Sequence, residues 1–232
     1  MNDSSSLIDH FTRNAGAYDE HNRPLAPVAD CMHLLIRLIL KDAPERARVL
    51  CVGVGTGNEI LSLSSVFPEW TFVGVDPSSG MLDVCRDKLR SAGVLDRTEL
   101  IQGYVNDLPL AENFDAALSL LVAHFLKRKE RMSFYQSICA RLCENGILVN
   151  TEISYDLNSP QCPSMLNNWE AVQLMMGATR ESLAEMPRVL REILSVNTPG
   201  ETENLLIQSG IRMPVRFFQA FMISGWYGRK SS

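Results

Sequence analysis

Short apolar runs alternate with helix-like segments through most of the first 153 residues of this chain. The apolar runs lie at residues 49–52, 70–75, 99–101, 114–120 and 147–152. Between them, apolar residues recur three or four positions apart, as they do along one face of an amphipathic helix. Strands that alternate with helices at this spacing predict an α/β, Rossmann-like fold, in which a mostly parallel sheet has helices on both faces.

The segments at either side of this alternating core have a different pattern. Residues 1–28 are interrupted by Pro24 and Pro27, so we expect an irregular or partly helical N-terminal arm. Residues 154–200 hold Trp169, two prolines near their start and a charged helical stretch, which favours a helical cap inserted into the core pattern. The sequence therefore predicts one domain: the arm, a cofactor-binding core at 29–153, the cap, and a C-terminal helix and strand pair at 201–232.

The C-terminal part should complete the sheet. An amphipathic helix at 201–209 is followed by two strand-like runs at 215–218 and 220–226. These runs are too close together for a crossover helix, so the last strand should be antiparallel to its neighbour. Together with the five core strands, they predict a seven-stranded sheet.

Composition narrows the function classes. The net charge of −5 gives no strong nucleic-acid signal, and no apolar run reaches the length of a membrane span. The polar N-terminus lacks a secretion pattern, and the six cysteines lie mostly in strand or helix patterns, so we expect a cytoplasmic protein. Cys139 and Cys143 should share one helix face, but no further cysteine or histidine pair completes a metal site there.

A glycine-rich turn carries the strongest chemical signal. Cys51-Val52-Gly53-Val54-Gly55-Thr56-Gly57 follows a strand and opens a helix, where glycines allow a tight turn and close approach of a ligand. The turn could also serve packing alone. Asp76 ends the second strand, where a carboxylate can accept hydrogen bonds from both ribose hydroxyls, or can interact with the dipole of the next helix. The G-x-G-x-G spacing differs from the G-x-G-x-x-G pattern of dinucleotide sites.

In this order, the motifs resemble the class I S-adenosylmethionine-dependent methyltransferases. The resemblance covers about residues 11–153 and 201–229 and rests on the stretches at 49–57, 73–82, 103–109, 114–118 and 142–148. It implies S-adenosylmethionine as the cofactor. The cofactor-binding candidates are Gly53, Val54, Gly55, Asp76, Pro77, Tyr104, Val105 and Ser119. Phe11, Ala15, Tyr18 and Asp19 look like the entry segment of small-molecule members, in which such a residue covers the cofactor, so Tyr18 and Arg23 are candidates for that role.

Two departures from the family pattern affect the cofactor site. Cys51 stands where the family usually has an acid that helps to bind the amino group of the cofactor. Tyr104 stands where an acid often accepts a hydrogen bond from the adenine amino group; its ring could stack on adenine or pack in a loop. Both readings of Tyr104 stay open.

The chain also partly resembles the tRNA wobble-uridine carboxymethyltransferase type. The matching residues are His124-Phe125-Leu126, Leu148-Val149 with Glu152, and Phe217-Phe218-Gln219. That type holds the extra carboxylate of its cofactor with a basic residue and a tyrosine in the inserted segment. The comparable stretch, Leu174–Ala178, has neither, although Arg180 is nearby, so we expect unmodified S-adenosylmethionine.

Three residues near the ends of strands are candidates for contact with the methyl acceptor. They are His124, Glu152 and Tyr155, and each also has a structural reading as a packing, capping or hydrogen-bonding group. Because the sulfonium makes the methyl group electrophilic, the protein must mainly align the acceptor and exclude water; a base is needed only for a protonated acceptor. Trp169 and nearby methionines (Met165, Met175, Met176, Met186) are candidates for a pocket wall, the core of the cap or a homodimer contact.

The resulting hypothesis is an enzyme that transfers a methyl group from S-adenosylmethionine to a small molecule or a nucleoside. An alternative is a protein of the same fold that binds S-adenosylmethionine without turnover, which Cys51 and Tyr104 make conceivable. A dehydrogenase with the same sheet is the third reading.

Overall fold

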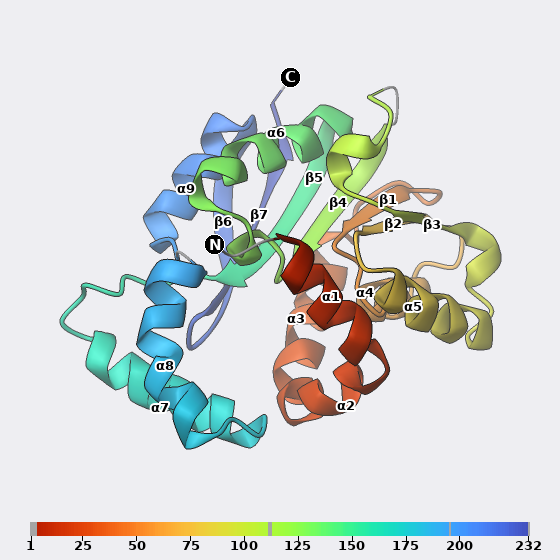
Figure 1. The fold of residues 1–232 in the computed structure, drawn as a ribbon. Coiled ribbons are helices and arrows are strands. Elements are labelled where there is room, and N and C mark those ends of the chain that lie inside the picture. Colours follow the sequence, from red (N-terminus) through yellow and green to blue (C-terminus); the bar gives the residue numbers. More distant parts are fainter. Residues whose placement is uncertain (1–3, 111–112, 195, 232) are drawn as a thin grey trace.

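A seven-stranded sheet forms the centre of the molecule (Figure 1). The computed structural model describes residues 4–110, 113–194 and 196–231, so residues 1–3 of the expected arm and Ser232 lie outside the described part. The strand order is β3-β2-β1-β4-β5-β7-β6. The strands are β1 (Arg48–Val52), β2 (Thr71–Asp76), β3 (Thr98–Gln102), β4 (Phe114–Leu120), β5 (Leu142–Ile153), β6 (Ile211–Ala220) and β7 (Ile223–Lys230).

The pairing of these strands confirms the predicted topology. Strands β1 to β5 pair in parallel, whereas β7 lies antiparallel between β5 and β6. The residues of β1 after Arg48 are all buried, because a parallel strand in the middle of this sheet is covered by helices on both faces. Strands β2 and β3 are added on one side of β1, and the chain then returns so that β4 lies on the other side of β1. This crossover places the carboxyl ends of β1, β2 and β4 around one crevice, where open α/β sheets bind their ligands.

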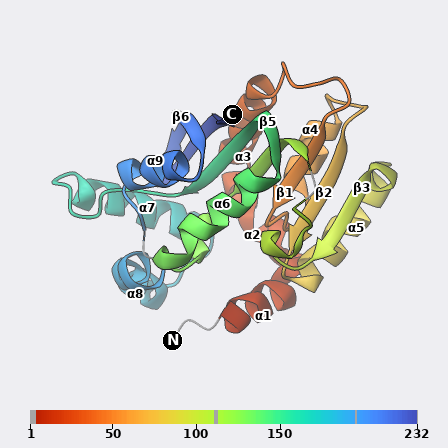
Figure 2. The same cartoon turned by 90° about the horizontal axis from the view of Figure 1, so that it is seen from above.

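Helices cover both faces of the sheet (Figure 2). On one face, α3 (Ala26–Ile39), α4 (Asn58–Ser64) and α5 (Ser79–Ser91) pack apolar side chains such as Ile36, Ile60 and Leu89 against the strands. On the other face, α6 (Arg131–Arg141) and α9 (Pro199–Gln208) contribute Ile138 and Leu206 to a second core layer. The alternation of side chains along each strand feeds these two layers.

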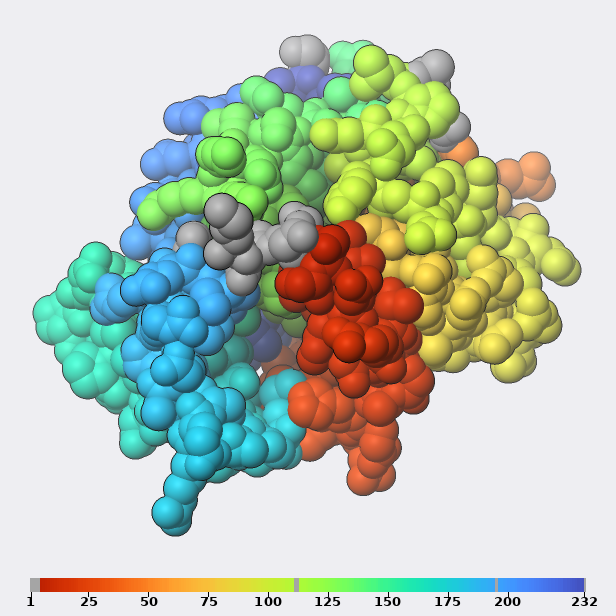
Figure 3. All heavy atoms as spheres, in the orientation of Figure 1, coloured from red at the N-terminus to blue at the C-terminus, as the bar shows by residue number. Residues whose placement is uncertain are grey.

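The N-terminal arm is more regular than the prolines suggested. It consists of α1 (Ser4–Asn14), α2 (Tyr18–Asn22) and two short 3₁₀ turns, and α3 starts at Ala26 rather than at 29. Pro24 lies within the second turn and Pro27 near the start of α3, where a missing N–H leaves no helical hydrogen bond broken. Figure 3 shows this arm in red on the front of the molecule, against the yellow segment that holds α5.

Residues 154–200 form a helical cap, as the sequence predicts. They contain α7 (Cys162–Met175), α8 (Arg180–Arg188) and a turn of π-helix (Val189–Ile193). Trp169 and Met186 are buried in a third apolar cluster, which also takes Met222 from the β6–β7 turn and Leu25 from the arm. Within the described residues, none of the helices is long and apolar enough to cross a membrane.

One local expectation was wrong. Cys139 and Cys143 do not share a helix face, because α6 ends at Arg141 and Cys143 already belongs to β5. Leu142 pairs with Phe114, and the strand then passes through Asn145 at φ 61° before it resumes regular pairing at Ile147. The start of β5 is thus irregular. Because it contains polar residues, the pattern of apolar runs did not predict it.

Candidate functional site

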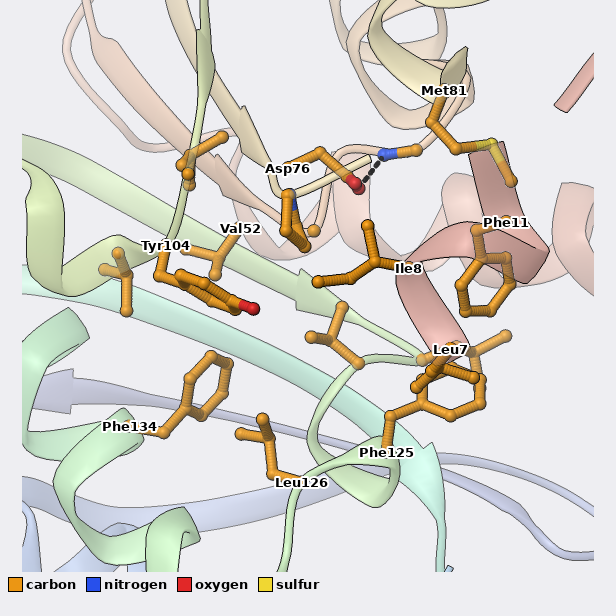
Figure 4. A pocket seen from close by; sticks show the side chains of 18 of the residues that line it. Leu7, Ile8, Phe11, Val52, Asp76, Met81, Tyr104, Phe125, Leu126 and Phe134 are labelled. Carbon is orange, nitrogen blue, oxygen red and sulfur yellow. Dashed lines mark hydrogen bonds between the residues drawn. The ribbon is translucent and has the colours of Figure 1, made fainter. Parts of the chain in front are cut away.

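A cavity of about 410 Å³ opens at the carboxyl ends of β1, β2 and β4, and α1 covers it (Figure 4). Its size falls within the usual range for small-ligand pockets. Its walls come from the glycine turn, the ends of β2 and β4, the loop after β3, α1 and the start of α6. Among the described residues that line it, none is lysine, arginine or histidine.

The glycine turn forms the floor beside β1. Gly53 has φ 66°, and a β-carbon placed there would lie 2.5 Å from Cγ2 of Val122. Only glycine combines this conformation with such close packing. The Gly53 N–H donates to the carbonyl of Val75 at 2.8 Å, which fixes the turn against the end of β2. Gly53 and Gly55, two of the candidate cofactor-binding residues, both line the cavity.

Asp76 lies at the end of β2 with its carboxylate at the cavity wall. Its Oδ2 accepts from the Gly55 N–H at 2.9 Å, and its Oδ1 accepts from the Ser78 N–H at 2.8 Å. Burial raises the pKa of Asp76, while these two N–H groups act in the opposite direction. Each carboxylate oxygen keeps further acceptor capacity, so the geometry fits a ligand with two neighbouring hydroxyls.

Tyr104 and Val105 face the cavity from the loop after β3, Pro77 lines it from the β2–α5 connection, and Met81 lines it from the first turn of α5. The ring of Tyr104 is about half exposed and reaches into the cavity near Phe134 (Figure 4). A flat apolar group between these walls would contact the Tyr104 ring. The position suits stacking on an adenine, one of the two readings that the sequence left open.

Helix α1 supplies an apolar lid. Leu7, Ile8 and Phe11 line the cavity, and Ile8 points into its centre between Asp76 and Phe125 (Figure 4). The rings of Phe11 and Phe125 meet edge to face with centroids 5.4 Å apart. The arm therefore closes this side of the cavity with its own side chains, and the spacing of Leu7, Ile8 and Phe11 was a helical signal that sequence reasoning missed.

A polar cluster fixes the arm to the glycine turn. Asp19 accepts from Lys88 Nζ at 2.6 Å, from the Thr56 hydroxyl at 2.8 Å and from the Asn58 amide at 3.0 Å. Burial alone would raise the pKa of Asp19, but these hydrogen bonds and the charge of Lys88 hold it below its usual value. The hydroxyls of Thr12 and Ser78, 2.9 Å apart, form a second contact between the arm and α5. Tyr18 lines the cavity beside this cluster.

Three predicted cofactor residues lie away from the lining. Arg23 is exposed and forms an ion pair with Glu20 at 3.0 Å. The side chain of Val54 is buried in the core layer on the α3–α5 face. Ser119 is fully buried in β4, and its hydroxyl has no hydrogen-bond partner among the described residues. We therefore do not assign ligand contacts to these three side chains.

His124 lies behind the cavity wall that Phe125 and Leu126 form. It is buried, its Nδ1 accepts from the Ile153 N–H at 3.4 Å, and burial lowers its pKa to about 3, with Arg131 acting in the same direction. The ring is thus neutral and turned toward β5. This position corresponds to the packing role that the sequence also allowed.

Glu152 also belongs to a buried structural network. Its carboxylate accepts from the Thr202 hydroxyl and from the Tyr135 hydroxyl, the latter at 3.4 Å. Burial raises its pKa, while the Thr202 hydrogen bond and the charge of Arg131 oppose the shift. Glu152 holds α9 and α6 against β5 and does not line the cavity.

The cap residues do not line the cavity either. Tyr155 packs against the apolar cluster of the cap, together with Met165, Met176 and Trp169. Arg131, which is fully buried, links the cap to the cavity wall: it donates to the carbonyls of Leu126 at 3.2 Å and of Leu194 at 2.5 Å. Within the described lining, Glu130 and Asp76 are the residues that carry a carboxylate.

Comparison with known proteins agrees with this geometry. A family model described as a methyltransferase domain matches residues 49–146, which include the glycine turn, Asp76 and Tyr104. The chain is 26% identical over 199 residues to the carboxy-S-adenosyl-L-methionine synthase of Campylobacter concisus, covering 85% of this chain and 84% of the relative. It is 26% identical over 228 residues to the synthase of that name from Methylococcus capsulatus, covering 96% and 94%.

Solved structures show the same fold. An O-methyltransferase family protein from Burkholderia thailandensis superposes with a TM-score of 0.71 at 14% identity, over 98% of this chain. The chain spans 63% of the length of that protein. The described chain therefore has the fold of the class I S-adenosylmethionine-dependent methyltransferases, whose cofactor is S-adenosylmethionine, and the match to the methyltransferase-domain model spans residues 49–146.

Proposed function

We propose that the protein transfers the methyl group of S-adenosylmethionine to a small molecule with an apolar body. The observation that carries this proposal is the lining of the cavity. Beyond Asp76, its walls are mainly aliphatic and aromatic, from Ile8 and Phe11 on α1 to Phe125, Leu126 and Phe134 on the opposite side. Such walls favour an uncharged acceptor and remove water from the reacting groups.

The cofactor assignments follow from where each side chain lies. Asp76 would accept hydrogen bonds from the ribose hydroxyls, with Pro77, Tyr104 and Val105 around the adenine. Gly53, Gly55 and Tyr18 would enclose the methionine part. Bound S-adenosylmethionine supplies an electrophilic methyl group, so the protein has to position an acceptor rather than activate the methyl donor.

Glu130 is the residue that we assign to the acceptor side. It is half-buried at the start of α6, lines the cavity, and no ion pair or hydrogen bond is found for its carboxylate within the described part of the chain. A carboxylate there can accept the proton of a hydroxyl or amine acceptor as the methyl group is transferred. His124 and Glu152 would not contact the acceptor, since both lie outside the lining.

Synthesis of a carboxylated S-adenosylmethionine is the second candidate. Two relatives with this name match most of the chain, and the partial resemblance of its motifs to the tRNA wobble-uridine carboxymethyltransferase type points to related cofactor chemistry. Against it, a carboxylate in the cavity would find no cationic side chain among the described lining residues. The nucleoside acceptor stays open under the first candidate.

Mass spectrometry separates these functions. Purified protein is incubated with S-adenosylmethionine and extracts rich in small metabolites or in nucleosides, with a Glu130→Gln variant in parallel. Methyl transfer yields S-adenosylhomocysteine and a methylated acceptor, whereas carboxylation yields a cofactor heavier by the mass of CO₂. If the protein binds S-adenosylmethionine but neither product forms with any extract, the alternative of a binding protein without turnover holds.

A further inference from the structure

Glu59 is a buried carboxylate close to two residues of the cavity lining, Tyr18 and Asp76. It is the second residue of α4, two positions after the last glycine of the turn, and only 9% of its surface is exposed. Burying an ionised carboxylate without a cationic partner is costly. No ion pair involves Glu59 in the part of the chain that the structure describes.

The groups around Glu59 offer little positive charge. Cys51 of β1, Cys85 of α5 and Asp76 of β2 lie close enough to interact electrostatically with it, as does Tyr18 of the arm. Lys88 is the cation whose charge reaches Glu59, but its Nζ is 2.6 Å from Asp19 and 2.6 Å from the Asn58 amide oxygen. Lys88 is therefore committed to the arm cluster, and Glu59 is left without a counter-ion.

The protein holds this carboxyl in its protonated form near neutral pH. Burial raises the pKa of Glu59 to about 8; its own backbone N–H and Lys88 lower the pKa, whereas Asp76 raises it. A cation that enters the neighbouring cavity would favour the ionised form. The neighbours Tyr18 and Asp76 both line that cavity, on the side where the glycine turn meets the arm.

S-adenosylmethionine brings a suitable cation to this side. Asp76 fits the ribose and Tyr104 the adenine, so the methionine part extends toward the glycine turn and Tyr18. Its α-ammonium group would then lie on the cavity side of Glu59, where β1 contributes the apolar Val52 to the lining and Cys51 is fully buried behind it. We propose that Glu59 is the counter-charge for the α-ammonium of the cofactor, acting from behind the glycine turn, and that cofactor binding releases the Glu59 proton to solvent.

This positioning role rests on the cofactor and not on which acceptor is methylated. Calorimetric titration at pH 7 in two buffers of different ionisation enthalpy counts the protons released. With S-adenosylhomocysteine, which has the α-ammonium but no sulfonium, we expect release of about one proton per site. With 5′-methylthioadenosine, which has the ribose but no amino acid part, we expect none. This second ligand controls for a change at Asp76.

Glu59→Gln keeps the shape and removes the charge. It should abolish proton release and weaken S-adenosylhomocysteine by about tenfold, the size of a partly screened charge interaction, while 5′-methylthioadenosine changes less than twofold. Adding Cys51→Asp to Glu59→Gln should restore most of the affinity, since it places a carboxylate among the same neighbours. Glu99→Gln, at an exposed position of β3, is the matched control and should behave as wild type.

Several outcomes would overturn the proposal. Proton release that persists in Glu59→Gln assigns the proton to another group. If protons are released with S-adenosylmethionine but not with S-adenosylhomocysteine, the charge partner of Glu59 is the sulfonium and not the α-ammonium. Equal weakening of both ligands in a Glu59→Gln protein that melts like wild type means that Glu59 supports the turn only. None of these results depends on turnover, so they are distinct from a failure of the proposed function.

Discussion

A β-carbon placed on Gly80 would lie 2.5 Å from the carbonyl oxygen of Thr12, so the start of α5 and the arm touch backbone to backbone. Gly80→Ala should therefore push α1 away from α5, although alanine favours the helix itself. We expect faster hydrogen exchange in residues 4–25 and about tenfold weaker binding of S-adenosylhomocysteine, roughly the loss of one or two packing contacts. Gly200→Ala, whose β-carbon meets no atom within 4 Å and whose φ is not in the left-handed region, tests a glycine replacement away from the arm.

The same exchange experiment tests the lid. Binding of S-adenosylhomocysteine should slow exchange in α1 and α2, because Ile8, Phe11 and Tyr18 line the cavity. The cap should respond weakly, since its side chains pack around Trp169 and not at the cavity. Strong protection of 154–194 would instead place the cap in the site and would contradict this division.

Asp76→Asn should weaken both S-adenosylhomocysteine and 5′-methylthioadenosine. The expected loss is about 1.5–3 kcal/mol in each case, the range for a hydrogen bond to a charged group. An equal loss of affinity for both ligands indicates a contact with the ribose, because 5′-methylthioadenosine has no amino-acid part. Calorimetry measures it, and Asp83→Asn, an exposed acid of α5, is the control. Unchanged affinity in the folded variant would refute the ribose role.

His124 should make the fold sensitive to acid. Its pKa is about 3 in the folded protein against 6.5 for an ordinary histidine, so below pH 6.5 the unfolded chain binds the extra proton. The contribution of His124 to the free energy of unfolding is thus fully present above pH 6.5 and is lost as the pH falls toward 3. His124→Gln should reduce the loss between pH 7 and 4.5 by about 2–3 kcal/mol in urea titrations. His21→Gln, at an exposed position of α2, is the matched control variant.

Glu59 should have the opposite effect, a loss of stability as the pH rises. Its folded-state pKa of about 8 lies above the ordinary 4.5, so the folded protein keeps the proton in this interval. Its contribution to stability is present below pH 4.5 and is lost as pH rises through 8. Between pH 5 and 9, the free energy of unfolding of wild type should fall by up to about 4 kcal/mol relative to Glu59→Gln. If the free energies of unfolding of the two proteins change with pH in the same way, the Glu59 carboxyl is not buried as described.

The strand pattern predicted the sheet well, because parallel strands buried on both faces read as apolar runs. Motif order likewise placed Gly53, Asp76 and Tyr104 around one cavity. The side chains that complete the site were harder to predict. Whether His124 points to the cavity or behind it depends on a 3₁₀ turn at Ala123–Phe125, and whether Glu152 is free depends on Thr202, fifty residues away. No sequence motif pointed to Glu59, because its raised pKa results from its burial in the fold.

The arm that closes the cavity also has a kinetic consequence. Ile8 and Phe11 stand on the cavity side of α1, and the Asp19 cluster fastens the next helix to the glycine turn. A spent cofactor can leave through this side only after the arm has detached, and a fresh one can be enclosed only after it returns. Motions of such segments take microseconds to milliseconds. The opening rate of the arm would then set an upper limit on the rate of cofactor exchange through this side.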